Sequence, residues 1–373
     1  MIHCNYLFAF LLVGVLGLMI SQSEQAAAND APAGLDSCNV VWTSPSKDAS
    51  GSMPIGNGEV GLNAWVEPNG DLLFYISRTD AWSECNRLLK LGRVRISLSP
   101  SPIAAGQVFR QELVLRDGQI VFHEGDTVLR LFVDAASPVI YITGECKTPR
   151  TVKATFETWR TAKRTLTGEE LGSSWTMQGA PAGIDVWESA DVVTRAAANQ
   201  NSVLIYHRNA YSCVPFTLKH QGLGSIASTV HDPLLNRTFG ACMAGLGLIA
   251  DRPTGLKSPE PAKQFDITIS THSTQTDTAA AWERQLQSPA SANAAVRRTS
   301  AWWHEFWNRS WILLDNNAPG VTEAYVLQRW VTACAGRGNY PIKFNGSIFT
   351  VDPKHVAGGP DYNADWRRWG DCY

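Results

Sequence analysis

Between residues 40 and 271 the chain is dominated by short runs in which apolar and polar positions alternate with a period of two. Residues 72–76 (LLFYI) are apolar at every position, which predicts a strand buried on both faces. Residues 93–99 (RVRISLS) alternate strictly, which predicts a strand with one face toward solvent. The Asp117-Gly118 pair separates two apolar runs and is a strong signal for a β-hairpin.

Other apolar runs predict the remaining strands, at residues 128–133, 139–142, 152–156, 203–206, 213–218, 243–248 and 265–270. Many strands with turn residues between them are typical of a large antiparallel sandwich. We therefore expect a mainly β protein whose N-terminal β-sandwich covers residues 38–275.

The period changes after this region. Helical patterns at residues 278–287 and 292–308 predict a helical linker over residues 277–314. The aromatic cluster within it, WWHEFW at residues 302–307, is expected to dock the linker on a neighbouring domain. Thr322 is a suitable N-cap for a third helix that ends near residue 335.

The N-terminus has the pattern of an export signal. Residues 7–20 (LFAFLLVGVLGLMI) form an apolar segment shorter than a membrane span, and three alanines follow at residues 26–28. This predicts a signal peptide over residues 1–28 and a secreted or periplasmic protein; the alternative is an uncleaved anchor. No later segment is apolar enough to cross a bilayer, so we expect no integral membrane protein.

Composition narrows the choice of partner. A net charge of −2 argues against nucleic acid, whose binding requires a wide basic face. The eight Cys show no CxxC spacing, so we expect no metal and no cofactor. The 14 Trp are numerous for this length, and flat indole faces suit sugar rings, although any single Trp more often packs a core.

Residues 339–373 show little periodicity but are rich in charged and aromatic side chains. Sugar recognition needs acceptors for hydroxyl groups, cations that orient carboxylates, and aromatic platforms. We expect substrate to be bound by Lys343, Asn345, Asp365, Trp366, Arg367, Arg368 and Trp369, with Asp371 as the candidate catalytic carboxylate. The alternative for Asp365 is a structural ion pair with Arg367 or Arg368 that holds the loop.

Three glycines lie close together in residues 53–61 (MPIGNGEVG). The simplest interpretation is a turn that leads into the next strand. The alternative is that the glycines let the backbone of this turn come close to a partner. A phosphate-binding loop is not expected, because the GxGxxG spacing is missing.

The same block resembles the start of the family 95 glycoside hydrolases, the α-L-fucosidase-like group. Three further motifs are similar to the bacterial family that carries the domain of unknown function 5703: residues 71–82 (DLLFYISRTDAW), 89–94 (LKLGRV) and 340–349 (YPIKFNGSIF). This resemblance implies a β-supersandwich, linker helices and, over residues 315–373, the truncated start of an (α/α)6 barrel, a six-hairpin toroid. It also implies that Asn345 faces substrate.

The function expected from these patterns is that of a secreted glycoside hydrolase that uses two carboxylates. The resemblance implies that the general acid lies further along the barrel, so that the present chain is an inactive fragment. A non-catalytic carbohydrate-binding or scaffold protein is the first alternative. A polysaccharide lyase is the second, with Tyr340, His355 and Arg368 as candidates for its site. The sugar, the linkage and the oligomeric state are left open.

Overall fold

The computed structural model describes residue 32 and residues 34–103, 107–180, 184–312, 314, 318–342, 347–355 and 359–367. The predicted signal peptide lies outside the described residues, as do Lys343, Asn345, Arg368, Trp369 and Asp371. Within the described ranges, no helix combines the length and the apolar character needed to span a bilayer.

The described part of the chain is mainly β, as the sequence predicts, and fifteen strands form one antiparallel system. The strands are β1 Val40–Trp42, β2 Met53–Gly56, β3 Val60–Val66, β4 Leu72–Trp82, β5 Leu88–Ser99, β6 Phe109–Val114, β7 Gln119–Glu124, β8 Thr127–Val133, β9 Val139–Glu157, β10 Arg164–Thr165, β11 Trp187–Glu188, β12 Val192–Ala196, β13 Asn199–Arg208, β14 Arg237–Gly245, β15 Ile249–Ala250, β16 Gly255–Lys257 and β17 Ala262–Gln275. Strands β10 and β11 form a separate small pair.

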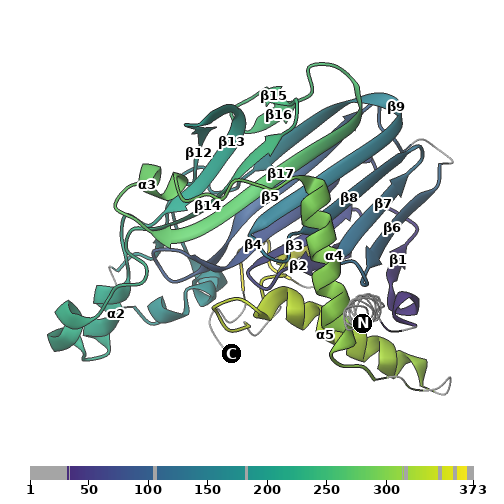
Figure 1. Cartoon of the computed structure of the whole chain (residues 1–373). Coiled ribbons are helices and arrows are strands. Elements are labelled where there is room, and N and C mark those ends of the chain that lie inside the picture. Colours follow the sequence, from purple (N-terminus) through teal and green to yellow (C-terminus); the bar gives the residue numbers. More distant parts are fainter. Residues whose placement is uncertain are drawn as a thin grey trace, which may run out of the picture.

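Two sheets share the long strand β9. The first has the order β1-β6-β7-β8-β9-β17-β14-β13-β12. The second half of β9 pairs with β5 and with β16, and β5 continues to β4, β3 and β2. The inward faces of both sheets supply one apolar core, in which Phe74 of β4 and Ile142 of β9 are members. The sheets therefore pack face to face as a sandwich (Figure 1).

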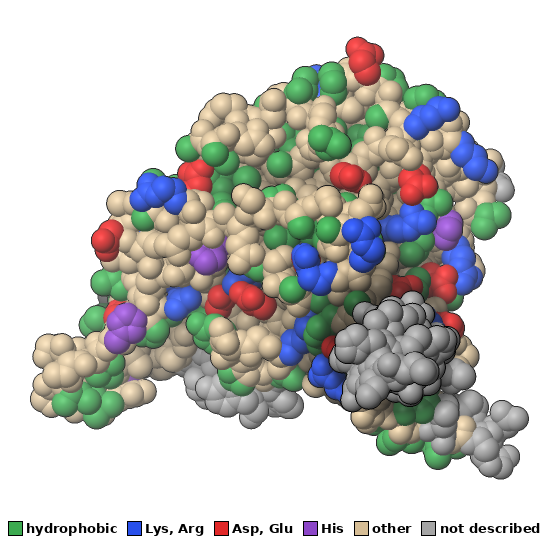
Figure 2. Space-filling model, in the orientation of Figure 1, with side chains coloured by type: hydrophobic (Ala, Val, Ile, Leu, Met, Phe, Trp, Pro, Cys, Tyr) green, Lys and Arg blue, Asp and Glu red, His purple; other side chains and the backbone are tan. Residues whose placement is uncertain are grey.

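The burial patterns predicted for two of the strands are confirmed residue by residue. Every residue of β4 except its last is buried, and β5 alternates between buried and half-buried positions along residues 93–98. The predicted hairpin joins β6 to β7, and Gly118 in its turn has φ +65°. On the face shown in Figure 2, acidic and basic side chains are interspersed.

The α-helices of the described residues are α2 Val214–His220, α3 Ala279–Glu283, α4 Ala292–Asn308 and α5 Pro319–Gly336. The 3-10 helices are Leu35–Cys38, Ala49–Gly51, Gly168–Ser173, Trp175–Met177, Gly224–Thr229 and Pro353–His355. Helix α4 has the predicted bounds, and α3 occupies only part of the helix expected at residues 278–287. The start of an (α/α)6 barrel is not shown by α5 alone and stays a prediction.

Two local predictions are wrong. Residues 213–218, expected as a strand, belong largely to α2, whose first turn contains Pro215. Proline has no N–H for a sheet ladder but fits the first turn of a helix, and no residue of α2 is buried. Thr322 does not cap a helix, because α5 already begins at Pro319; its hydroxyl instead accepts a hydrogen bond from the Leu314 amide at 3.0 Å.

The aromatic cluster of α4 docks the helices on the sandwich, as expected. The Trp303 ring stacks on Trp330 of α5, with 4.3 Å between ring centroids, and Trp307 Nε1 donates to the Leu115 carbonyl at 2.8 Å. A Cβ on Gly118 would lie 2.0 Å from the Trp303 indole. The hairpin turn therefore needs glycine for the contact with α4 as well as for its positive φ.

The glycine block of residues 53–61 forms the β2–β3 turn, as the simplest interpretation predicts, and the end of α5 comes close to its backbone. The Gly58 amide donates to the Cys334 carbonyl at 2.9 Å, and the Gly338 amide donates to the Gly58 carbonyl at 3.1 Å. Gly58 has φ +87°, and a Cβ there would lie 2.6 Å from the Arg337 amide nitrogen. The C-terminal end of α5 thus rests directly on this turn.

We predict that Gly58→Ala lowers the free energy of unfolding by about 3 kcal/mol or more, because it adds a backbone clash to the cost of a left-handed residue. The control is Gly247→Ala: Gly247 has φ +72° and nothing within 4 Å of a built Cβ. We expect that control to lose only about 1–2 kcal/mol. Equal losses in denaturant unfolding would show that the contact with α5 contributes nothing.

Candidate functional site

Three of the predicted site residues lie in the described segment 359–367, which crosses the end of the sandwich near β5 and the 3-10 helix Gly168–Ser173. They are Asp365, Trp366 and Arg367. The other five lie outside the described residues, so the structure gives no position for them. The site is therefore built here from the segment that carries the first three.

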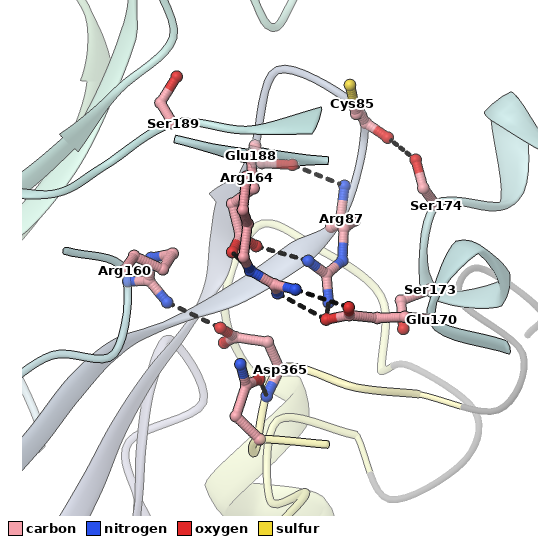
Figure 3. A network of polar contacts seen from close by, with 12 residues as sticks. Cys85, Arg87, Arg160, Arg164, Glu170, Ser173, Ser174, Glu188, Ser189 and Asp365 are labelled. Carbon is pink, nitrogen blue, oxygen red and sulfur yellow. Dashed lines mark hydrogen bonds and ion pairs between the residues drawn. The ribbon is translucent and has the colours of Figure 1, made fainter. Parts of the chain in front are cut away.

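Asp365 anchors this segment. Its side chain is buried, and its Oδ1 accepts a hydrogen bond from the Lys90 amide at 2.7 Å. Oδ2 accepts a hydrogen bond from Trp159 Nε1 at 2.6 Å. It also accepts one from Arg160 Nη1 at 2.8 Å (Figure 3). Burial alone would raise the pKa of Asp365, but Arg160 and Arg87 hold that pKa below its ordinary value. The carboxylate is thus a fixed anion inside the protein.

The sequence left open a structural ion pair between Asp365 and Arg367 or Arg368, and the structure shows an ion pair with a different arginine. Asp365 does form an ion pair, but with Arg160, which lies 205 positions earlier in the chain. Arg160 in turn contacts Asp191 at 2.9 Å and donates to the Lys90 carbonyl at 2.7 Å. The pair therefore joins the C-terminal segment to the sandwich rather than bracing the loop on itself.

Two other side chains extend the attachment. The Lys90 ammonium group is buried and donates to the Ser77 hydroxyl and to the Ile348 carbonyl, both at 2.9 Å. Burial, and then the nearby Arg367, hold the pKa of Lys90 well below its ordinary value. Arg367 is buried as well; its guanidinium donates to the Ser347 carbonyl, and its amide donates to the Ser173 hydroxyl.

Trp366 is the most accessible of the three predicted residues that the structure describes. Its side chain is half-buried, and its Nε1 donates to the Glu169 carbonyl at 3.3 Å. Its ring stacks against the half-buried Tyr362, with 5.9 Å between ring centroids. The pair forms a partly exposed aromatic surface beside the buried anchor.

A second group of charges, buried except for the half-buried Arg164, lies beside the anchor (above Asp365 in Figure 3). Arg87 contacts Glu170 at 3.2 Å and Glu188 at 2.5 Å. Arg164 contacts the same two carboxylates, at 2.6 and 3.1 Å. Two arginines and two carboxylates therefore neutralise one another at the base of the 3-10 helix that carries Ser173 and touches Trp366.

His207 of β13 connects this end of the sandwich to Asp191. It is fully enclosed between Glu84, at 2.8 Å from Nε2, and Asp191, at 3.0 Å from Nδ1. Burial alone would lower the pKa of His207, but hydrogen bonds to Asp191 and Glu84 raise it to about 9. The imidazole is thus a buried cation at neutral pH.

Sequence reasoning missed Arg160, Lys90 and His207, which hold the segment. The available signal was a charged or titratable residue inside an apolar strand, as with Lys90 between Leu89 and Leu91. Such a residue becomes buried only when another part of the protein covers the face of the strand on which its side chain lies. Within the described ranges, no group of three or more His, Cys, Asp or Glu side chains is placed to hold a metal ion.

Residues 41–312 match the N-terminal part of a family described as "Domain of unknown function (DUF5703)". The chain belongs to the DUF5703 family. This confirms the family resemblance that its motifs indicate, and the matched residues include all of the sandwich except the first residue of β1, together with Arg160, His207 and α4. The relation of this DUF5703 protein to the family 95 glycoside hydrolases stays a prediction.

No curated protein matches the DUF5703 protein. Among solved structures it is similar to a bacterial glucoamylase complexed with acarbose, with 9% sequence identity and a TM-score of 0.29. The match covers 79% of this chain and 44% of the glucoamylase chain, so the DUF5703 protein spans under half of that length. A TM-score of this size does not establish a common fold.

We predict that Asp365→Asn loosens the C-terminal segment, because it leaves a buried arginine without half of its counter-charge. Breaking a buried pair typically costs about 3–5 kcal/mol. Protease cleavage within residues 359–367 should rise steeply, and denaturant unfolding should shift to lower concentration. Asp361→Asn is the control, since Asp361 is largely exposed and 3.5 Å from Lys354. If proteases cleave residues 359–367 at the same rate in both variants, Asp365 does not anchor the segment.

The His207 ion triad predicts a pH dependence of stability. Because the folded pKa of about 9 lies above the ordinary 6.5, this stabilisation is complete below pH 6.5 and is lost as pH rises through 9. The difference in the free energy of unfolding between the native protein and His207→Gln should therefore fall by about 3 kcal/mol between pH 6 and pH 10. The measurement is urea unfolding across this range, with the exposed His123→Gln as control. A constant difference between native protein and variant would refute the buried imidazolium.

Proposed function

We propose that this DUF5703 protein is carbohydrate-active and that its sugar site is built on the segment that Asp365 anchors. The observation that carries the proposal is the anchor itself, with three hydrogen bonds to one buried carboxylate. It fixes the backbone at Asp365, and the residues that follow in the sequence include Trp366, Arg368, Trp369 and Asp371, whose chemistry suits sugar. Preorganised polar groups bind more tightly, because less conformational entropy is lost on binding.

The described neighbours support a sugar ligand. The Tyr362–Trp366 pair offers aromatic surface on which the C–H face of a pyranose can stack. The charges of Arg87, Arg164, Glu170 and Glu188 are paired with one another, so a polar rim for hydroxyl groups would have to come from side chains nearer the surface. A sugar needs this combination of apolar platform and polar rim.

As the reaction we propose glycoside hydrolysis with Asp371 as one of two carboxylates. The support is the resemblance of residues 53–61 to family 95 glycoside hydrolases, with the (α/α)6 barrel that this resemblance implies. The signal-like residues 1–28 support export of the protein to the cell exterior or periplasm.

Carbohydrate binding without hydrolysis is the second candidate, and one observation favours it. Asp365, the acid nearest Asp371 in the described segment, is a buried anion with a lowered pKa and three protein donors. A general acid instead needs a pKa near the working pH and access to the leaving oxygen. Asp365 is therefore assigned as a positioning residue, and the second carboxylate of a hydrolase is left unassigned.

The test is oligosaccharide binding by calorimetry together with release of reducing sugar from the same panel. We expect Trp369→Ala to weaken binding about tenfold, equivalent to about 1.4 kcal/mol. Turnover is measured on the full-length gene product, in which Asp371→Asn should lower it by about 100-fold or more without changing unfolding. The control is Asp251→Asn, at the exposed ion pair with Lys257 on the sandwich.

Full turnover in Asp371→Asn would remove that residue from the site. Binding without any turnover in the full-length gene product would select the second candidate. Failure of the whole panel to bind would refute the carbohydrate assignment of this segment.

A further inference from the structure

The outer face of the first sheet has a polar floor far from the C-terminal segment. The strand register places Arg130 of β8 opposite Thr143 of β9, and Thr143 opposite Asp266 of β17. All three side chains are half-buried and belong to the outward-facing set, since the residues that alternate with them are buried. The next row across the same strands consists of Val128, Glu145 and Gln264.

The first turn of α4 forms a wall beside this floor. Ala292, Asn293 and Val296 line one cavity of about 550 Å³, together with the row that contains Thr143. In Figure 1, α4 lies across this face of the sheet, over the region of β8 and β17. Leu246, which is 83% exposed, lines the same cavity from the β14 side.

A second cavity of about 500 Å³ continues the first. Glu145 and Gln264 line both cavities, so the two form one groove over β8, β9 and β17. Each cavity alone has the size of a small-molecule site. An elongated groove of this kind fits a chain of several rings better than a single compact ligand.

The charges in the groove are balanced. Three cations (Arg130, Lys147 and Lys263) and three carboxylates (Asp126, Glu145 and Asp266) line it, with the amides of Gln119, Gln264 and Asn293. A sugar hydroxyl group both donates and accepts hydrogen bonds, so it can use either sign of charge. An anionic ligand would meet three carboxylates, and a purely apolar ligand would desolvate many charges.

Asp266 offers an acceptor that the fold does not use. In the part of the chain that the structure describes, no group donates a hydrogen bond to its carboxylate. Partial burial raises the pKa of Asp266, which reflects the same lack of protein partners. A ligand hydroxyl group would supply the missing donor and stabilise the anion.

We propose that this groove binds a neutral glycan chain, at a site separate from the C-terminal segment. The proposal does not require the anchored segment to bind sugar, because its floor and wall belong to the sandwich and to α4. Its role would be to hold a polymer on the protein without chemistry.

The test is affinity electrophoresis in gels that contain soluble β-glucan, galactomannan or pullulan, with alginate as the anionic polymer. Thr143→Trp fills the centre of the groove, and Asp266→Ala removes the free acceptor. We expect at least one neutral polymer to retard the native protein, a tenfold or greater loss with Thr143→Trp, and a several-fold loss with Asp266→Ala. Lys153→Trp is the matched control, since it adds the same indole at an exposed position of β9 outside the groove.

Retardation lost in Thr143→Trp and kept in Lys153→Trp, with unchanged melting temperatures, supports the groove. Retardation by alginate alone, or by no polymer, overturns it. Unchanged retardation in both groove variants also overturns it. If Trp366→Ala then abolishes the retardation, the polymer is bound by the C-terminal segment, so the groove fails while the proposed function stands.

Discussion

The attachment of the C-terminal segment depends on the rule that a buried charge must be paired. Asp365 has left water completely, and the fold compensates it with the Arg160 guanidinium, the Trp159 indole and one backbone amide. Because Arg160 also contacts Asp191, and Asp191 contacts His207, the compensation extends from the segment into the sandwich. Loss of one charge leaves the next uncompensated, which makes the arrangement sensitive to single substitutions.

Close backbone approach is the second means of attachment. The β2–β3 turn meets the end of α5 through Gly58, and the β6–β7 turn meets the Trp303 ring of α4 through Gly118. Neither position has room for a Cβ. The two hairpin turns of the sandwich therefore fix both helices, and the segment after α5 begins from a defined place. Because α5 is fixed in this way, residues that follow it in the chain can lie against Lys90 and Ser77 of the sandwich.

Much of the sandwich was predictable because strand periodicity is a local property. Residues 72–76 and 93–99 showed which faces would be buried, and Asp117-Gly118 marked its hairpin. The strand predicted at residues 213–218 was wrong because apolar character was weighed above Pro215, which favours the first turn of a helix. For the candidate site, sequence indicated the segment and its residue types, while five of the eight residues lie outside the described ranges.

By itself, the sequence determined the mainly β class, the bounds of α4 and the family, because these follow from periodicity and motifs carried by contiguous residues. Only the tertiary structure decided that Asp365 pairs with Arg160 across 205 positions, that the Lys90 ammonium group contacts the Ile348 carbonyl, and that Thr143 and Asp266 lie side by side on the floor of a groove. Ion pairs and grooves depend on which distant strands become neighbours. That information lies in the packing of two sheets and two helices against one another, and no local pattern contains it.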